Sequence, residues 1–170
     1  MNGQSWEGYL DWSGLRHLTE VISLDGILNQ SLVEPDYDDP DDWNFLHVFG
    51  HHQTGLYTSL DYVLKRMKGE SNFNLLTVAM EPDQVCNSVC IEGFEFIGYD
   101  LLDQDFAISP LTNCRGIKES FLPIDLNEKG LIDEYAKAYD IKKRLLENNP
   151  DVHHADTNVF AIWRHKSIGQ

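Results

Sequence analysis

The 170-residue chain has little cysteine, few basic residues and no long apolar run. Three cysteines (Cys86, Cys90 and Cys114) are an odd set, which excludes a fully paired disulfide framework and favours reduced thiols. The longest apolar runs, such as residues 75–80, are far shorter than the ~20 residues of a membrane-spanning helix. No basic-then-apolar signal peptide is apparent at the N-terminus. We therefore expect a cytoplasmic protein without a membrane partner.

Basic residues are scarce, with 13 Lys and Arg against 28 Asp and Glu, for a net charge of −15. Residues 1–50 hold ten acids and one base, residues 51–126 hold eleven and five, and residues 127–170 hold seven of each. Such acidity repels phosphate backbones and anionic membranes, so nucleic acid is not an expected partner. A basic protein would be attracted. Ordinary solubility of an acidic cytosolic protein is the alternative explanation.

Motifs of the common cofactor and nucleophile sites are also missing. The chain contains no G-x-G-x-x-G or G-x-x-x-x-G-K-[ST] phosphate loop and no G-x-S-x-G elbow. Cys86 and Cys90 are separated by three residues, whereas zinc ribbons and redox motifs favour two. We therefore expect no cofactor, and the sequence favours a protein that is not an enzyme.

The most distinctive segment present is acidic and spans residues 34–42. Carboxylates packed this closely repel one another, so we expect an exposed loop. A calcium loop is disfavoured because no glycine stands at the turn and His47 stands where a closing glutamate is needed. The segment is then either a solvated loop, with Trp43 buried in the core, or a partner-binding surface with aromatic anchors. The partner-binding residues would be Asp36, Tyr37, Asp38, Asp39, Asp41, Asp42 and Trp43.

Two histidine pairs suggest a second kind of site. His51 and His52 precede one expected helix, and His153 and His154 follow another. If these helices are antiparallel neighbours, the two pairs could meet and supply imidazole ligands to a metal such as zinc. Histidines exposed in loops are the alternative.

A small enzyme would need a nucleophile or an acid–base pair. Cys114 precedes Arg115, whose charge could lower the thiol pKa, and His154 with Asp156 could assist it. An inert, buried thiol is the alternative reading of Cys114.

Apolar periodicity predicts a single α+β domain over residues 1–170. Helices are expected from Gly14 to about Ser23, over 56–67, and from residue 127 or 128 to 148. Strands are expected over 43–49, 73–80, 94–102 and 157–163, with 73–80 central because it is apolar on both faces. These elements predict two layers: a sheet of about four mainly antiparallel strands, with two long helices on one face.

Three stretches carry a resemblance to known sequences: residues 93–103 (GFEFIGYDLLD), 108–114 (ISPLTNC) and 153–164 (HHADTNVFAIWR). They resemble an uncharacterised family of small acidic bacterial proteins, and the resemblance brings no catalytic residues with it. In size, acidity and class the chain is also similar to the immunity proteins of bacterial toxin systems, which are small cytosolic domains that plug basic toxin nucleases.

The leading hypothesis is therefore an immunity-like binding protein whose acidic surface engages a basic protein. The alternatives are a small enzyme that uses Cys114 or a histidine-rich metal site, and a subunit that assembles into a homodimer.

Overall fold

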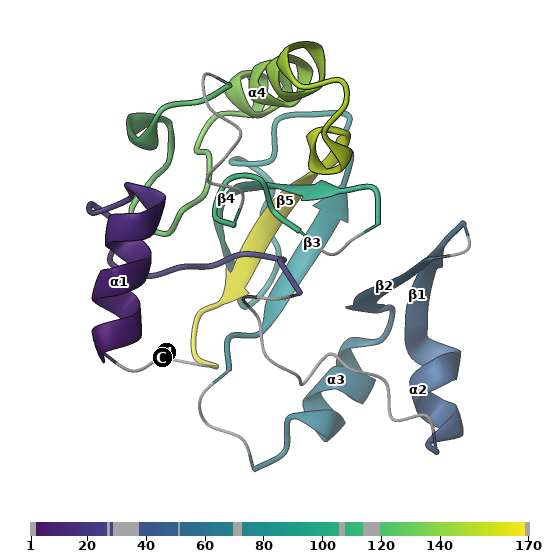
Figure 1. The fold of residues 1–170 in the computed structure, drawn as a ribbon. Helices are drawn as coiled ribbons and strands as arrows, with labels where there is room; N and C mark the ends of the chain where they lie inside the picture. The colour runs from purple at the N-terminus through teal and green to yellow at the C-terminus, as the bar shows by residue number, and fades with distance from the viewer. Residues whose placement is uncertain are drawn as a thin grey trace.

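A computed structural model describes residues 3–26, 28, 38–50, 52–69, 73–105, 108–113 and 120–168, without the side chains of 3–5, 52 and 53. Its elements are α1 (Gly3–Ser13), α2 (Pro40–Phe45), β1 (Leu46–Phe49), β2 (His52–Tyr57), α3 (Leu60–Arg66), β3 (Leu76–Met80), β4 (Phe94–Asp103), η1 (Pro123–Asp125), α4 (Tyr135–Asn148), η2 (His153–Ala155) and β5 (Thr157–His165) (Figure 1). No helix in this part of the chain is long and apolar enough to cross a membrane.

The main sheet has the order β3-β5-β4, and both pairings are antiparallel. β5 is the central strand, and its first seven residues are all buried. β3 is an edge strand of intermediate burial, so the central position expected for residues 73–80 is wrong. Gly98 marks a bulge in β4, where its φ of 139° and the Leu131 side chain beside it leave no room for a Cβ atom.

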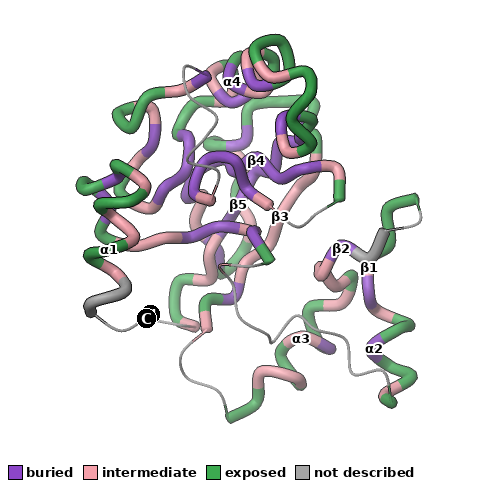
Figure 2. Tube along the Cα trace, in the orientation of Figure 1, coloured by how far each residue is buried: buried purple, intermediate pink, exposed green. Residues whose placement is uncertain are grey.

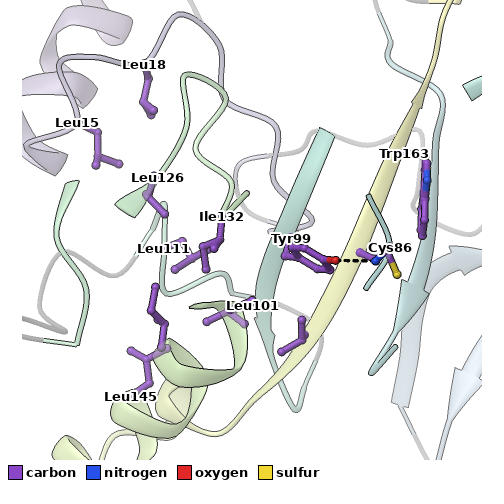
Figure 3. Close-up of a cluster of buried hydrophobic side chains, with 14 of the residues drawn as sticks. Leu15, Leu18, Cys86, Tyr99, Leu101, Leu111, Leu126, Ile132, Leu145 and Trp163 are labelled. Atoms are coloured by element: carbon purple, nitrogen blue, oxygen red, sulfur yellow. Dashed lines mark hydrogen bonds between the residues drawn. The ribbon is translucent and has the colours of Figure 1, made fainter. Parts of the chain in front are cut away.

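Alternate residues of β5 divide the core between the two faces of the sheet. Val159, Ala161 and Trp163 belong to one buried cluster, and Phe160 and Ile162 belong to the other. The first cluster also takes up the buried side chains of α4 (Figure 3). Burial is concentrated along β4 and β5 and on one side of α4 (Figure 2).

The N-terminal helix differs from the expectation. Residues 14–23 form no helix; α1 precedes them and ends at Ser13, because Gly14 takes a φ of 72°. The apolar residues expected on the missing helix, Leu15, Leu18 and Ile22, are nevertheless buried. The segment is held by the backbone of residues 128 and 129, which accepts hydrogen bonds from the amides of residues 19, 20 and 22.

The second sheet is the β1–β2 hairpin, which lies between α2 and α3 in sequence. We call residues 40–66 the hairpin lobe; Figure 1 shows it apart from the three-stranded sheet. Residues 43–45 end α2 instead of starting a strand, and the helix expected over 56–67 is only the seven-residue α3. α3 still reaches the main core, because Val63 and Met67 pack against its first cluster.

The chain is therefore a mixed α+β protein with antiparallel sheets, as predicted. Its described strands are divided between sheets of three and two strands, so the single sheet of about four strands is not confirmed. Only one of the two long helices is found, α4, which starts at Tyr135 instead of residue 127 or 128. The two-layer arrangement is not confirmed either.

Candidate functional site

The hairpin lobe is built around an aromatic cluster and one buried ion pair. Tyr62 stacks on Phe45 with 4.9 Å between ring centroids and lies 5.6 Å from the Tyr57 ring. The Asp42 carboxylate is fully buried and pairs with Arg66, whose guanidinium lies over the Tyr57 ring. Because a buried charge is costly unless it is paired, this contact fixes α2 against α3.

Capping residues define both helices of the lobe. The Asp39 side chain accepts a hydrogen bond from the Asp41 amide at 2.9 Å, and Pro40 stands in the first turn of α2. Ser59 accepts from the Tyr62 amide at 3.3 Å at the start of α3. Part of the acidic segment is thus used to start a helix.

Several large apolar side chains of the lobe are exposed. Leu60 and Leu64 lie one turn apart on α3 and are both exposed. Trp43 is 40% exposed, and it is not among the residues of the two core clusters. The exposed large apolar residues of the lobe are Trp43, Val48, Phe49, Leu60 and Leu64.

The partner-binding residues predicted from the sequence separate into three groups. Asp36 and Tyr37 lie outside the described residues. Asp38 and Asp41 are exposed, and Asp39 is half-buried as the cap of α2. Asp42 is buried against Arg66, so it is withdrawn from any surface that a partner could contact.

The second histidine pair lies against the end of β4. His154 Nδ1 is 2.9 Å from Asp103 Oδ2, and His153 Nε2 is 2.9 Å from Asp105 Oδ2. Asp103 is buried, whereas the two histidines are more open to solvent. We call Asp103, His153 and His154 the Asp–His cluster.

The other predicted metal and catalytic residues are placed differently. His51 and Cys114 lie outside the described residues, as does the side chain of His52, so a meeting of the two histidine pairs stays a prediction. The Asp156 carboxylate accepts a hydrogen bond from the Gln104 side chain at 3.3 Å. The carboxylate that contacts His154 is therefore that of Asp103 and not that of its near neighbour in sequence.

Sequence reasoning missed a buried polar network between β4 and the N-terminal segment. Asp100 is fully buried in β4 and accepts hydrogen bonds from Ser23 and Ser109 hydroxyls and from the amides of Leu24 and Leu101, at 2.7–3.1 Å. Ser109 also links Asp100 to a second buried carboxylate, because its amide donates to Asp25 at 2.9 Å. Asp100 stands among apolar residues in the strand expected over residues 94–102, and this position was the signal that could have revealed the network.

The environment of Asp100 changes its acidity. Burial raises the pKa of Asp100 to about 6, although the four donors that face the carboxylate act in the opposite direction. Burial, reinforced by the negative charges of Asp25 and Asp100, also raises the pKa of Tyr9 to about 12. The Tyr9 hydroxyl donates to the carbonyl of Thr112 at 2.8 Å. The network thus ties α1 to the sheet through hydrogen bonds among hydroxyl, amide, carbonyl and carboxyl groups.

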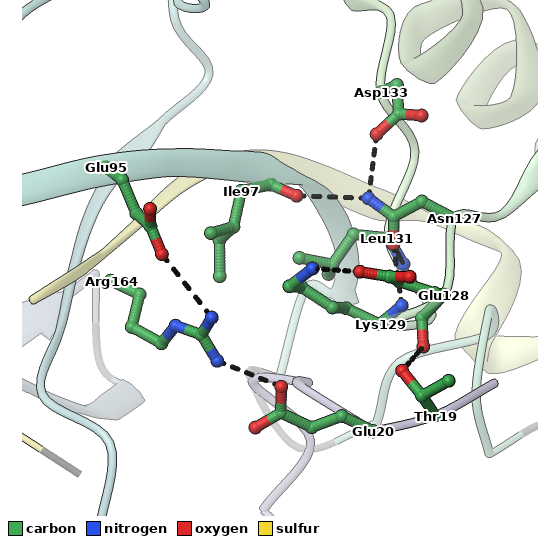
Figure 4. Close-up of polar contacts among 10 residues, drawn as sticks. All are labelled: Thr19, Glu20, Glu95, Ile97, Asn127, Glu128, Lys129, Leu131, Asp133 and Arg164. Atoms are coloured by element: carbon green, nitrogen blue, oxygen red, sulfur yellow. Dashed lines mark hydrogen bonds and ion pairs between the residues drawn. The ribbon is translucent and has the colours of Figure 1, made fainter. Parts of the chain in front are cut away.

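An open cavity of about 450 Å³ lies beside β4 and the 127–133 segment (Figure 4). Arg164 donates to Glu20 at 2.9 Å and to Glu95 at 3.4 Å, and Lys129 donates to Glu128 at 2.8 Å. An anion bound here would compete with these ion pairs, so the cavity is a poor anion site. Its lining residues are Glu95, Phe96, Ile97, Asn127, Glu128, Lys129 and Asp133.

Comparison with known proteins gives no relative: no protein-family model, no curated protein and no solved structure matches the chain.

Proposed function

We propose that this chain is a cytoplasmic binding protein that engages a basic protein through the hairpin lobe, in the manner of an immunity protein. The observation that carries the proposal is the set of apolar side chains exposed on the lobe, Trp43, Val48, Phe49, Leu60 and Leu64. Apolar and aromatic side chains exposed together are typical of protein contact surfaces.

Charge supports a basic partner for this surface. The exposed acids Asp38, Asp41 and Asp61 belong to the same part of the chain as the apolar residues. Among the described residues, the carboxylates of Asp25, Asp42, Asp100 and Asp103 are buried, so a partner would meet the negative charge carried by the other acids. The remaining negative charge still favours encounter with a basic surface and gives an association rate that falls as salt rises.

The test uses two matched triple variants as affinity baits in lysate of the source cell. The lobe variant carries Trp43→Ser, Leu60→Ser and Leu64→Ser. The control carries Val85→Ser, Leu122→Ser and Ile124→Ser, three exposed apolar residues outside the lobe. We expect the wild type and the control to retain a basic protein that the lobe variant loses. The purified pair should then associate more slowly as salt rises and when Asp38, Asp41 and Asp61 are changed to Asn.

Three results would contradict the proposal. These are retention of the same protein by the lobe variant, equal loss in both variants, or an association rate that does not change with salt. Recovery of a second copy of this chain, with a dimer seen by light scattering, would replace the basic partner by self-assembly.

A further inference from the structure

We propose that the Asp–His cluster is a binding site for a divalent transition metal ion, with zinc as the best-matched ion. Asp103, His153 and His154 each offer one ligand atom, and these atoms lie within 4.8 Å of one another. This proposal rests on different residues from the partner-binding surface and is independent of it.

The backbone holds the three side chains together from two directions. Asp103 is the last residue of β4, and the histidines form the start of η2, just before β5. The amide of Gln104 donates to the carbonyl of Asp156 at 3.1 Å, and the amide of Ala155 donates to that of Val152 at 2.9 Å. The cluster is thus positioned by the β4–β5 pairing and by the turn that enters β5, before any ion binds.

A hydrogen bond between Asp103 and His154 would by itself explain their contact, so a second observation is needed. Thr157 provides it: this residue is fully buried, and its hydroxyl oxygen has no hydrogen-bond partner among the described residues. Thr157 pairs directly with Asp103 in the antiparallel ladder, so the two side chains lie on the same face of the sheet. Because buried hydroxyls are normally satisfied, the Thr157 hydroxyl on the face of this carboxylate is a group that a metal-bound water could hydrogen-bond.

The donor set selects the class of metal. Two imidazole nitrogens and one carboxylate oxygen suit zinc and its neighbours, whereas calcium and magnesium take oxygen ligands only. Three protein ligands leave a fourth position of a tetrahedral zinc open to water. Asp105, which contacts His153, is placed to orient that ring, as carboxylates beside metal-bound histidines do.

Only a small rearrangement is needed to close the site. Zinc–ligand bonds of about 2.0–2.1 Å place tetrahedral ligands roughly 3.4 Å apart, and the three ligand atoms of the cluster already lie within 4.8 Å of one another. The His153 side chain is 65% exposed and can move without disturbing the core. His154 Nδ1 and Asp103 Oδ2 already lie 2.9 Å apart.

The experiment uses full-length protein without a histidine tag, stripped of metal with a chelator and titrated with zinc chloride in a calorimeter. We expect one zinc per chain, a higher melting temperature with zinc, and d–d absorption typical of tetrahedral coordination when cobalt replaces zinc. His153→Gln and His154→Gln should each weaken binding at least tenfold. Both changes are at partly exposed residues, so folding is expected to survive. His17→Gln is the matched control, because His17 lies outside the cluster and contacts the carbonyl of Leu126.

Each alternative outcome argues against the site. No zinc in the calorimeter, or equal affinity in the wild type and in both cluster variants, would overturn the proposal. So would equal weakening in His17→Gln, which would mean scattered binding to surface histidines. Loss of binding in a His51→Gln/His52→Gln variant, with binding retained in His154→Gln, would move the site to the first histidine pair.

Discussion

The three-stranded sheet and the hairpin lobe differ in how much apolar side chain they bury. β5 buries seven residues in succession, and its apolar side chains fill a cluster on each face. The described residues of the lobe that are buried are only Asp42, Leu46, Thr54 and Tyr62. The sheet is therefore stabilised mainly by apolar burial, whereas the lobe depends on one ion pair and a small aromatic cluster.

This difference explains why a binding surface is more plausible on the lobe than on the sheet. Elements with little buried apolar area have a low free energy of local unfolding, and such elements commonly form binding surfaces. The lobe leaves five large apolar side chains at least 38% exposed, which is the basis of the binding surface proposed for it. Because the lobe has few buried side chains, a single substitution can disrupt its structure.

The two regions also bury their aspartates differently. Asp42 is buried beside the guanidinium of Arg66, whereas Asp100 is surrounded by two hydroxyls and two amides. Pairing with a cation stabilises the charged form of a carboxylate, whereas burial raises the pKa of Asp100 although its four hydrogen-bond donors lower it. The sheet should therefore respond to pH at this residue, and the lobe to loss of its ion pair.

The largest expected effect comes from opening a cavity in the sheet. Phe160 is fully buried in β5, so Phe160→Ala should lower the free energy of unfolding by about 3–5 kcal/mol. Ile124, which is 84% exposed, is the control, and Ile124→Ala should stay within about 0.5 kcal/mol of wild type. Urea unfolding followed by circular dichroism measures both. A loss below 1 kcal/mol for Phe160→Ala would contradict the proposed role of apolar burial.

The second-largest expected effect is a dependence of the free energy of unfolding on pH, caused by Asp100. Because its pKa is raised from 3.8 to about 6, the folded state holds more protons at this carboxyl than the unfolded state between those values. Its contribution to stability is therefore complete below about pH 4 and is lost as pH rises through 6, a change of about 3 kcal/mol. Carboxyl-carbon NMR titration should find this group near pH 6.

Asp125 is the internal control for this titration. Burial acts to raise its pKa, but hydrogen bonding to Lys137, helped by the amide of Leu122, lowers it below the ordinary value. Titration of Asp100 near its ordinary pKa of 3.8, instead of near 6, would show that the network does not hold this carboxyl as the structure indicates.

Replacing the ion pair tests the lobe directly. Asp42→Asn removes the charge that faces Arg66 and should destabilise the lobe by about 2 kcal/mol. We expect faster hydrogen exchange at backbone amides of residues 40–66, with little change in β4 and β5. The same change in both regions would mean that the lobe and the sheet unfold as one unit.

The sequence predicted the sheet better than the lobe for a physical reason. The apolar segments at residues 94–102 and 157–163 located β4 and β5 closely, and α4 ends at residue 148, as expected. The lobe elements are four to seven residues long, too short for periodicity to separate helix from strand. Burial was easier to predict than conformation, since Leu15 and Leu18 enter the core without forming a helix.

The candidate sites depend on contacts between distant residues. Sequence proximity suggested Asp156 as the partner of His154, but strand pairing brings Asp103 there from 51 residues away. Likewise, Ser109 reaches Asp25 across 84 residues. Pairwise spacing along one chain cannot identify such contacts, because they are set by the register of β4 against β5 and by the path of the N-terminal segment.

The smallest expected effect on stability separates folding from binding on the lobe. Trp43 and Leu64 are each 38–40% exposed, so Trp43→Ser and Leu64→Ser should each change the free energy of unfolding by less than about 1 kcal/mol. The same changes should weaken binding to a basic partner strongly, because aromatic and apolar anchors carry most of the energy of a protein interface. Urea unfolding and calorimetric titration with the purified partner measure the two quantities on the same samples. A large loss of stability with unchanged affinity would mean that Trp43 supports the interior of the lobe and does not bind a partner. The lobe would then use its apolar side chains for folding, as the sheet does, and the contrast between the two regions would be wrong.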